Sequence, residues 1–190
     1  MKTGAAHKEA PQNKHTLATG GMAATSGEHY MEYVNYLRAF PLLSKIGDED
    51  LKALAGLLKE HKTAAGENVI TEGDVGAEMY ILIEGSVDII KTTVFGDKFV
   101  VATLNADDHC VFGEMAMIDN DKRSATVRAK TNCKTLSIDH ASFEHFCDER
   151  PQSGVELLRL ISINLVRNIR TENNNLRMVY QALIEEIEMG

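Results

Sequence analysis

The spacing of apolar and polar positions changes several times along this chain. Residues 1–28 contain almost no large apolar side chain, so burial cannot offset the entropy of ordering them, and we expect a mobile tail. Residues 29–62 carry apolar positions at helical spacing, with Pro41 ending one helix and Asp48 capping the next. The pattern therefore predicts a tail followed by an N-terminal segment of two short helices.

Residues 63–139 consist of short runs of β-branched and aromatic side chains that turn residues separate at roughly ten-residue spacing. The expected strands are residues 69–71, 79–84, 87–91, 99–104, 126–129 and 134–138. Short strands at this spacing predict an antiparallel β-barrel of the jelly-roll kind. The absence of crossover helices between the runs argues against a parallel α/β sheet.

The helical period returns in residues 140–190, with a short helix expected over residues 140–147 and Pro151 in the first turn of a long one. The long helix would extend about 50 Å, more than a small barrel can cover. Its apolar positions step by three, four or seven residues and are Leu158, Leu165, Ile169, Leu176, Val179 and Leu183. Such a seam is typical of a two-helix interface, so we expect a homodimer. The alternative is a helix that packs only on its own domain.

Residues 171–175, TENNN, interrupt this seam with polar side chains on every face of the helix. A polar gap can simply set the register of a dimer, at some cost in stability. The other interpretation is that a polar ligand is presented to the helix at this level.

Composition limits the function. With 190 residues, 44% hydrophobic and 25% charged, the chain is expected to form one main globular domain with appendages. Its net charge of -8 disfavours a nucleic-acid partner. No apolar run reaches the ~18 residues of a membrane helix and no signal peptide is apparent, so we expect no membrane contact and a cytoplasmic location.

Catalytic, metal-binding and redox motifs are missing from the sequence. His140 and His145 are five residues apart and form no HExxH motif, and neither GxSxG nor a Walker motif occurs. Cys110, Cys133 and Cys147 are too widely spaced for a CxxC site and are expected to be reduced, mostly buried thiols. We therefore expect a protein that is not an enzyme and holds neither a metal nor a cofactor.

Residues 112–129, FGEMAMIDNDKRSATVRA, place an acid and a base at the two ends of an apolar stretch. Glu114 opens a single helical turn, and Arg123 follows nine residues later, where a strand begins. The N–H groups of a turn and the guanidinium bind an anion, while a carboxylate accepts from a hydroxyl. Taken singly, such an Arg is usually solvated and such a Glu usually interacts with a helix dipole. Together they predict a site for a sugar phosphate.

These residues resemble the phosphate-binding cassette of the cyclic nucleotide-binding domain family, F-G-E-[LM]-A-[LMI] followed by a short loop and R-[AST]-A-[ST]-[VI]. The resemblance extends over about residues 40–172 and includes Gly66, Gly73 and Gly85. Within this family, the chain resembles the sensor half of receptor-type transcription factors and the domains of kinase regulatory subunits. It implies a jelly-roll fold and a cyclic nucleotide, cAMP or cGMP, as the ligand.

The resemblance also implies roles for individual residues. Glu114 would accept the ribose 2′-hydroxyl and Arg123 would pair with the cyclic phosphate. Backbone N–H groups would complete the phosphate site, contributed by Gly113, Glu114, Met115, Ala116, Ser124 and Ala125.

The base is less well determined. Lys122 stands where many members of the family have Pro, and Ser124 favours cAMP over cGMP. Glu172 and Asn173, in the long helix, are the expected contacts to the base. A Glu acceptor suits the adenine amino group as well as a guanine donor edge, so both bases stay open.

Receptor-type members carry a helix-turn-helix domain after the long helix, and here the sequence ends at Gly190, so we expect no direct DNA binding. The prediction is a sensor or regulatory module that passes ligand binding through its C-terminal helix to an unknown partner protein or output domain. The alternative is a dimeric interaction module whose pocket is degenerate or takes another ligand, such as cGMP or a cyclic dinucleotide.

Overall fold

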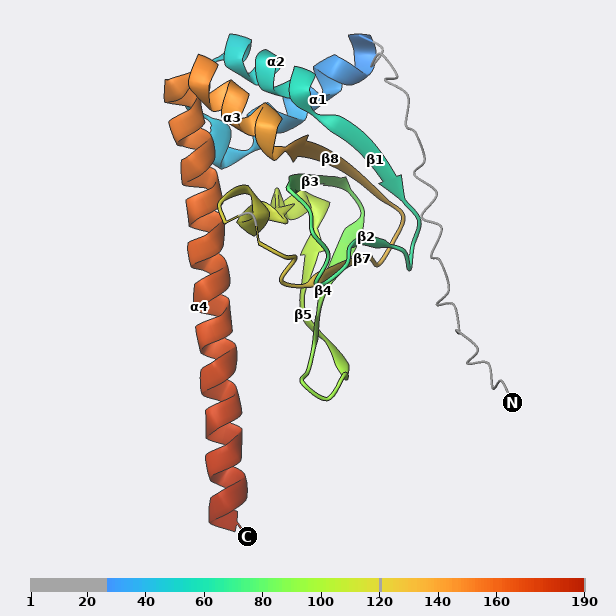
Figure 1. Ribbon diagram of the computed structural model, residues 1–190, viewed down its shortest axis with the longest axis vertical. Coiled ribbons are helices and arrows are strands. Elements are labelled where there is room, and N and C mark those ends of the chain that lie inside the picture. Colours follow the sequence, from blue (N-terminus) through green and yellow to red (C-terminus); the bar gives the residue numbers. More distant parts are fainter. Residues whose placement is uncertain (1–26, 120, 190) are drawn as a thin grey trace, which may run out of the picture.

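The structure is a computed structural model that describes residues 27–119 and 121–189. Most of the predicted tail lies outside the described residues. The elements in chain order are α1 (Gly27–Ala39), η1 (Pro41–Leu43), α2 (Asp48–Leu57), β1 (Lys59–Thr63), β2 (Asn68–Ile70), β3 (Glu78–Glu84), β4 (Ser86–Thr92), β5 (Lys98–Asn105), η2 (Ala106–Asp108), β6 (Val111–Phe112), η3 (Glu114–Met117), β7 (Thr126–Ala129), β8 (Cys133–Asp139), α3 (His140–Glu149) and α4 (Pro151–Met189). Figure 1 shows α1, α2 and α3 gathered at one end of the strands, with α4 running past them.

The strands form two four-stranded antiparallel sheets, ordered β1-β8-β3-β6 and β2-β7-β4-β5. This architecture confirms the predicted mainly β, jelly-roll-like fold with flanking helices. In the first sheet Tyr80 of β3 pairs with Phe112 of β6, and their rings stack with centroids 5.4 Å apart. This pairing fixes where β6 ends and therefore where the next residues, Gly113 and η3, must lie.

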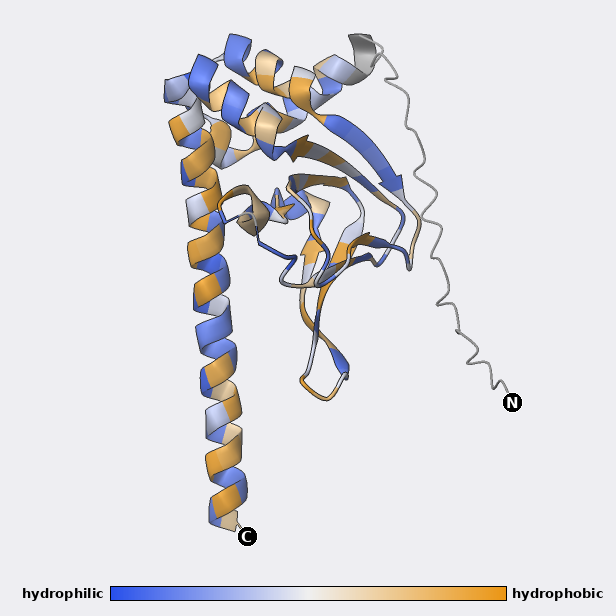
Figure 2. Ribbon diagram, in the orientation of Figure 1, coloured by the Kyte–Doolittle hydropathy of each residue, from blue (hydrophilic) through white to orange (hydrophobic). Residues whose placement is uncertain are grey.

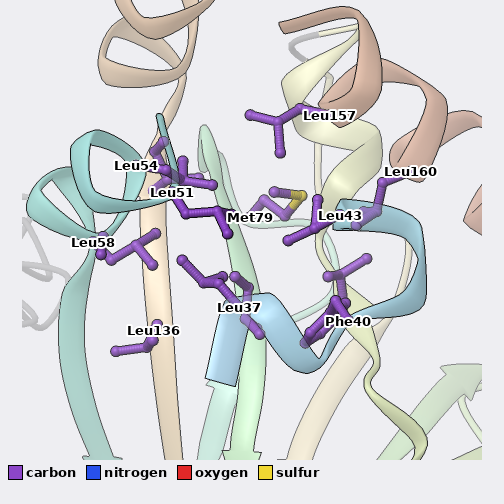
Figure 3. Close-up of a cluster of buried hydrophobic side chains, with 14 of the residues drawn as sticks. Leu37, Phe40, Leu43, Leu51, Leu54, Leu58, Met79, Leu136, Leu157 and Leu160 are labelled. Atoms are coloured by element: carbon purple, nitrogen blue, oxygen red, sulfur yellow. The ribbon is translucent and has the colours of Figure 1, made fainter. Parts of the chain in front are cut away.

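The larger of two apolar cores lies between the helices and the first sheet (Figure 3). It draws Leu37 from α1, Leu51 from α2 and Leu136 from β8, all nearly inaccessible to water. The first turns of α4 belong to it as well, since Leu157 and Leu160 are each 4% exposed. Burying a leucine stabilises a fold by about 1.5–3 kcal/mol, so this part of α4 is an integral part of the domain.

The beginning of α4 is also held by polar contacts. The Asp50 carboxylate of α2 accepts from Arg150 Nε at 3.0 Å and from Ser153 Oγ at 2.5 Å. Gly154 allows α3 and α4 to approach closely, because a Cβ there would lie 2.9 Å from the Cα of Cys147. These contacts fix the direction in which α4 leaves the helical end of the domain.

The side chains of α4 are exposed from Val166 onward. After Asn168, the described residues give this helix no hydrogen bond, ion pair or core contact outside itself. Within the predicted seam, Ile169 is 59% exposed and Leu176 52%, whereas Leu165 packs partly against the core. Figure 2 shows apolar and polar residues mixed along this free half. The homodimer stays a prediction that a single chain does not test.

Two local expectations are wrong. Asp48 is the first residue of α2 rather than its N-cap, which is Gly47, and its carboxylate accepts from Arg38 at 2.8 Å. The segment 29–62, expected to be helical, ends in the strand β1. The composition of β1, KEHKT, gives no strand signal, but backbone pairing with β8 imposes the conformation.

Among the described residues, no helix combines the length and the apolar character needed to cross a bilayer.

Candidate ligand-binding site

The site is built on the turn that joins β6 to η3. Gly113 has a φ of 75°, in the left-handed region, and opens the single turn Glu114–Met117 that the sequence predicts. A Cβ at this position would lie 2.9 Å from Arg123 Nη1 and 3.1 Å from the carbonyl oxygen of Glu78. Both the backbone conformation and the space around Gly113 therefore require glycine. The first N–H groups of such a turn have no acceptor within the turn itself.

Hydrogen bonds of both the backbone and the side chain fix the position of Arg123. Its N–H donates to the carbonyl of Asp74 and its carbonyl accepts from Gly73, both at 2.9 Å. Nη1 donates to the carbonyl oxygens of Glu78 at 2.8 Å and Gly113 at 3.1 Å. The residue is only 8% exposed, so its guanidinium is fixed in place at the turn.

The edge of this guanidinium formed by Nε and Nη2 is free to bind a ligand. Within residues 27–119 and 121–189, Arg123 Nε and Nη2 have no hydrogen-bond partner. In the same residues, Thr135 Oγ1 is the only side-chain nitrogen or oxygen that is both inaccessible to water and without a hydrogen-bond partner. Because Arg123 Nε and Nη2 have no partner either, they must be accessible to water. Gly76 leaves room for this edge, since a Cβ there would lie 2.8 Å from Nε. The geometry suits an anion bound by two parallel N–H groups.

Glu114, the first residue of η3, is buried with 4% exposure, and within the described residues it forms no ion pair. Its Oε1 accepts from two amides of α4, Asn164 Nδ2 at 2.9 Å and Asn168 Nδ2 at 3.1 Å. Burial raises the pKa of the Glu114 carboxyl, while the residue's own backbone N–H and the Asn164 amide act to lower it. The carboxylate is thus compensated by neutral donors from α4. The ribose hydroxyl, which the resemblance implies as a further partner of Glu114, stays a prediction.

The other predicted cassette residues lie at the same place. Ala116 is buried, whereas Met115 is 44% exposed. The Ser124 hydroxyl donates to the Met115 sulfur at 3.4 Å, which joins η3 to the segment leading into β7. Ala125 is half-buried next to it. The structure therefore brings residues 113–116 and 123–125 together, as the motif predicts.

Glu172 and Asn173 are not brought to this turn. Both are exposed on the free half of α4. At about 100° per residue, Glu172 lies about 40° around the helix from Asn168, whereas Asn173 lies about 140° away. Glu172 therefore shares the side of α4 that faces the site, one turn further on. Asn173 points elsewhere, and the base contact predicted for both residues stays a prediction.

Asn164 and Asn168 are the site residues that sequence reasoning missed. They are separated from Glu114 by 50 and 54 residues, so no local motif connects them. The available signal was a pair of amides four residues apart within INLVRN. The first of them comes three residues after Ile161, the last buried apolar residue of α4.

The cysteines are separate from the site and free of disulfides. Cys110 and Cys133 are buried and Cys147 is partly so. Burial raises the pKa of the Cys110 thiol to about 11, which keeps it protonated and unreactive. No group of three His, Cys, Asp or Glu side chains within the described ranges is arranged to hold a metal ion.

A jelly-roll domain that carries a fixed guanidinium and a buried carboxylate at one glycine turn has the features of a binding domain for a small anion. Residues 60–150 match the cyclic nucleotide-binding domain family. Over this segment the chain belongs to that family, and the resemblance seen in the sequence is confirmed.

Relatives and solved structures agree with this assignment. The chain is 34% identical over 129 residues to a cAMP-dependent protein kinase regulatory subunit of Schizosaccharomyces pombe, a match covering 68% of this chain and 29% of that protein. It shares its fold with the crystal structure of a cyclic nucleotide-binding domain from Methylobacillus flagellatus, at 21% identity and a TM-score of 0.69 over 80% of this chain and 84% of that one.

The fold also matches the regulatory subunit of a cAMP-independent protein kinase A from Trypanosoma brucei. The identity is 25% and the TM-score 0.61, over 71% of this chain and 47% of that one. The chain spans only 26–29% of the length of three fungal regulatory subunits that it matches, so what those whole proteins do is not carried over.

Proposed function

We propose that this domain is a sensor that binds a cyclic nucleotide, most favourably cAMP, and passes the binding event through α4 to a partner protein or an output domain. The observation that carries the proposal is the open Nε and Nη2 edge of Arg123, held rigidly beside the turn that bears Glu114. A cyclic phosphate is a diester with one negative charge, and one bidentate Arg together with turn N–H groups can balance it.

The proposed binding mode places each part of the ligand on a different group. The cyclic phosphate lies on Arg123 and the N–H groups of residues 113–116 and 124–125. The ribose 2′-hydroxyl donates to Glu114 Oε2, because Oε1 already takes two amide bonds. The base extends toward the next turn of α4, where Glu172 is the nearest predicted contact. Ser124 and the name of the Schizosaccharomyces pombe relative both favour cAMP.

Transmission would use the free half of α4. Its apolar seam offers a surface for a second copy of this chain, and Glu114 bonds directly to the part of α4 that precedes it. We expect no catalytic activity, no DNA binding by these residues and a cytoplasmic location. The downstream partner is a protein or domain whose identity the site does not specify.

A second candidate is a dimeric interaction module whose pocket takes another ligand. It is favoured by the similarity to the Trypanosoma brucei subunit, which is named as belonging to a cAMP-independent kinase. The same fold is therefore compatible with a protein that does not respond to cAMP. Comparison of cAMP, cGMP and cyclic dinucleotides in one titration series separates the two candidates.

The Arg123→Ala variant tests the proposed site. Truncating one partner of a buried charge pair costs about 2–5 kcal/mol of affinity, which is about 30-fold or more. The matched control is Arg159→Ala, which removes the same charge from an exposed residue of α4 whose one ion-pair partner within the described residues is Glu156. Displacement of a fluorescent cAMP analogue measures both variants. Equal affinity of Arg123→Ala and the control would show that the phosphate binds elsewhere.

A further inference from the structure

Two asparagines of α4 form a clamp on the buried carboxylate of Glu114. Asn164 and Asn168 are four residues apart and therefore lie on one side of the helix. Both direct an amide nitrogen at the same oxygen, Oε1, at 2.9 and 3.1 Å. Asn164 Nδ2 also lies 3.4 Å from the carbonyl oxygen of Val111, which ties the same amide to β6.

The clamp satisfies a physical requirement of the site. A carboxylate that is 4% exposed loses the water that would solvate its charge. The ionisable groups of the elements packed around it include Arg123 and Glu78 on the barrel and Arg167 on α4. Within the described chain, none of them forms an ion pair with Glu114. The two amides are therefore the side-chain donors that stabilise the ionised form.

We propose that Asn164 and Asn168 are positioning residues that fix the Glu114 carboxylate through Oε1 and present Oε2 to a ligand hydroxyl, so that affinity depends on α4 lying against the barrel. The proposal rests on the proposed function for the identity of that ligand. It assigns to two residues of the long helix a role that no local motif of the sequence contains.

The place of the clamp along α4 gives it a second consequence. Leu160 and Ile161 are buried in the core, whereas from Val166 onward the helix is exposed. The clamp therefore lies where α4 leaves the barrel. A ligand that binds better to the oriented carboxylate must, by linkage, also favour the clamped position of α4. The free half of the helix is thereby coupled to occupancy of the site.

Asn168→Asp tests the clamp at an exposed position, where the substitution keeps the side-chain size but replaces a donor with a negative charge. Asn164→Ala provides a second variant that removes a donor without adding charge. The matched control is Asn174→Asp, the same change at an exposed residue of the same helix that is not part of the clamp. Circular dichroism checks that each variant is folded.

The first measurement needs no ligand. A carboxyl ¹³C NMR titration should show the pKa of Glu114 higher in Asn168→Asp and Asn164→Ala than in wild type, and unchanged in Asn174→Asp. The removed donors stabilise the ionised form, which gives the sign of this shift. An identical Glu114 titration in wild type and both clamp variants would overturn the proposal.

The second measurement is the affinity for cAMP at two pH values. Asn168→Asp should bind about tenfold more weakly or worse, a loss of one decade in Kd. Its deficit should grow as the pH falls, because more of its Glu114 is protonated. A deficit equal to that of Asn174→Asp would contradict the positioning role. If wild-type protein binds no cyclic nucleotide, the proposed function fails, and the ligand-free titration still decides whether the clamp exists.

Discussion

Replacing Gly113 with alanine tests how closely the two halves of the site fit together. The φ of 75° at this residue lies in the left-handed region, where alanine costs about 1–2 kcal/mol. The added Cβ would also lie 2.9 Å from Arg123 Nη1, 3.0 Å from Ile70 Cδ1 and 3.1 Å from the Glu78 oxygen. The Glu78 oxygen belongs to the backbone of β3 and cannot move aside, so Arg123 must shift.

Gly66→Ala is the matched control. Gly66 has a φ of 89° but no atom within 4 Å of the position of a Cβ, so it carries the conformational cost without the collision. Both variants should therefore lower the free energy of unfolding by at least about 1–2 kcal/mol, measured by urea denaturation. Only Gly113→Ala should also lose affinity for cAMP, by about 1.4 kcal/mol or more, which is tenfold in Kd.

If Gly113→Ala binds cAMP as tightly as Gly66→Ala does, the position of the Arg123 guanidinium has no influence on the ligand. The phosphate would then have to bind away from the turn.

Two further predictions concern the dimer and the response to acid. Leu176→Lys places a charge in the exposed seam of α4 and should give monomers in sedimentation equilibrium. The control Met178→Lys, at a residue that is 72% exposed and outside the seam, should leave the dimer intact. A dimer that survives Leu176→Lys would place the interface elsewhere. Asp139 caps α3 by accepting from the Ser142 N–H and also pairs with Lys59, and these contacts together lower its pKa from 3.8 to about 2. Because the folded-state pKa is the lower one, this contribution is fully present above about pH 4 and is lost as the pH falls toward 2. In Asp139→Ala the loss of the cap should cost about 1 kcal/mol at neutral pH, and the free energy of unfolding should fall less between pH 4 and 2 than in wild type; equal acid sensitivity would contradict this role.

The strands that carry β-branched runs could be predicted from the sequence. The six expected strands correspond to β2, β3, β4, β5, β7 and β8, with ends that differ by at most two residues. β1 and β6 were missed for physical reasons. The strand β1 is polar and takes its conformation from pairing with β8, and β6 has only two residues. Neither leaves a periodic signal in the chain.

The same limit applies to the site. Gly113, Glu114 and Arg123 could be predicted because one turn and its flanking strand hold them within a short stretch of sequence. The partners of Glu114 could not, because the packing of α4 on the barrel brings Asn164 and Asn168 to it across 50 or more residues. The carboxylate looked uncompensated in the sequence only because its donors lie in another element.

A calorimetric titration of cAMP into wild-type protein that has been shown to be free of co-purified nucleotide tests the central claim most directly. We expect saturable binding with one ligand per chain, tighter for cAMP than for cGMP. The contradicting result is the absence of saturable heat with cAMP, cGMP and cyclic dinucleotides alike, which would mean that the open edge of Arg123 does not serve a cyclic nucleotide.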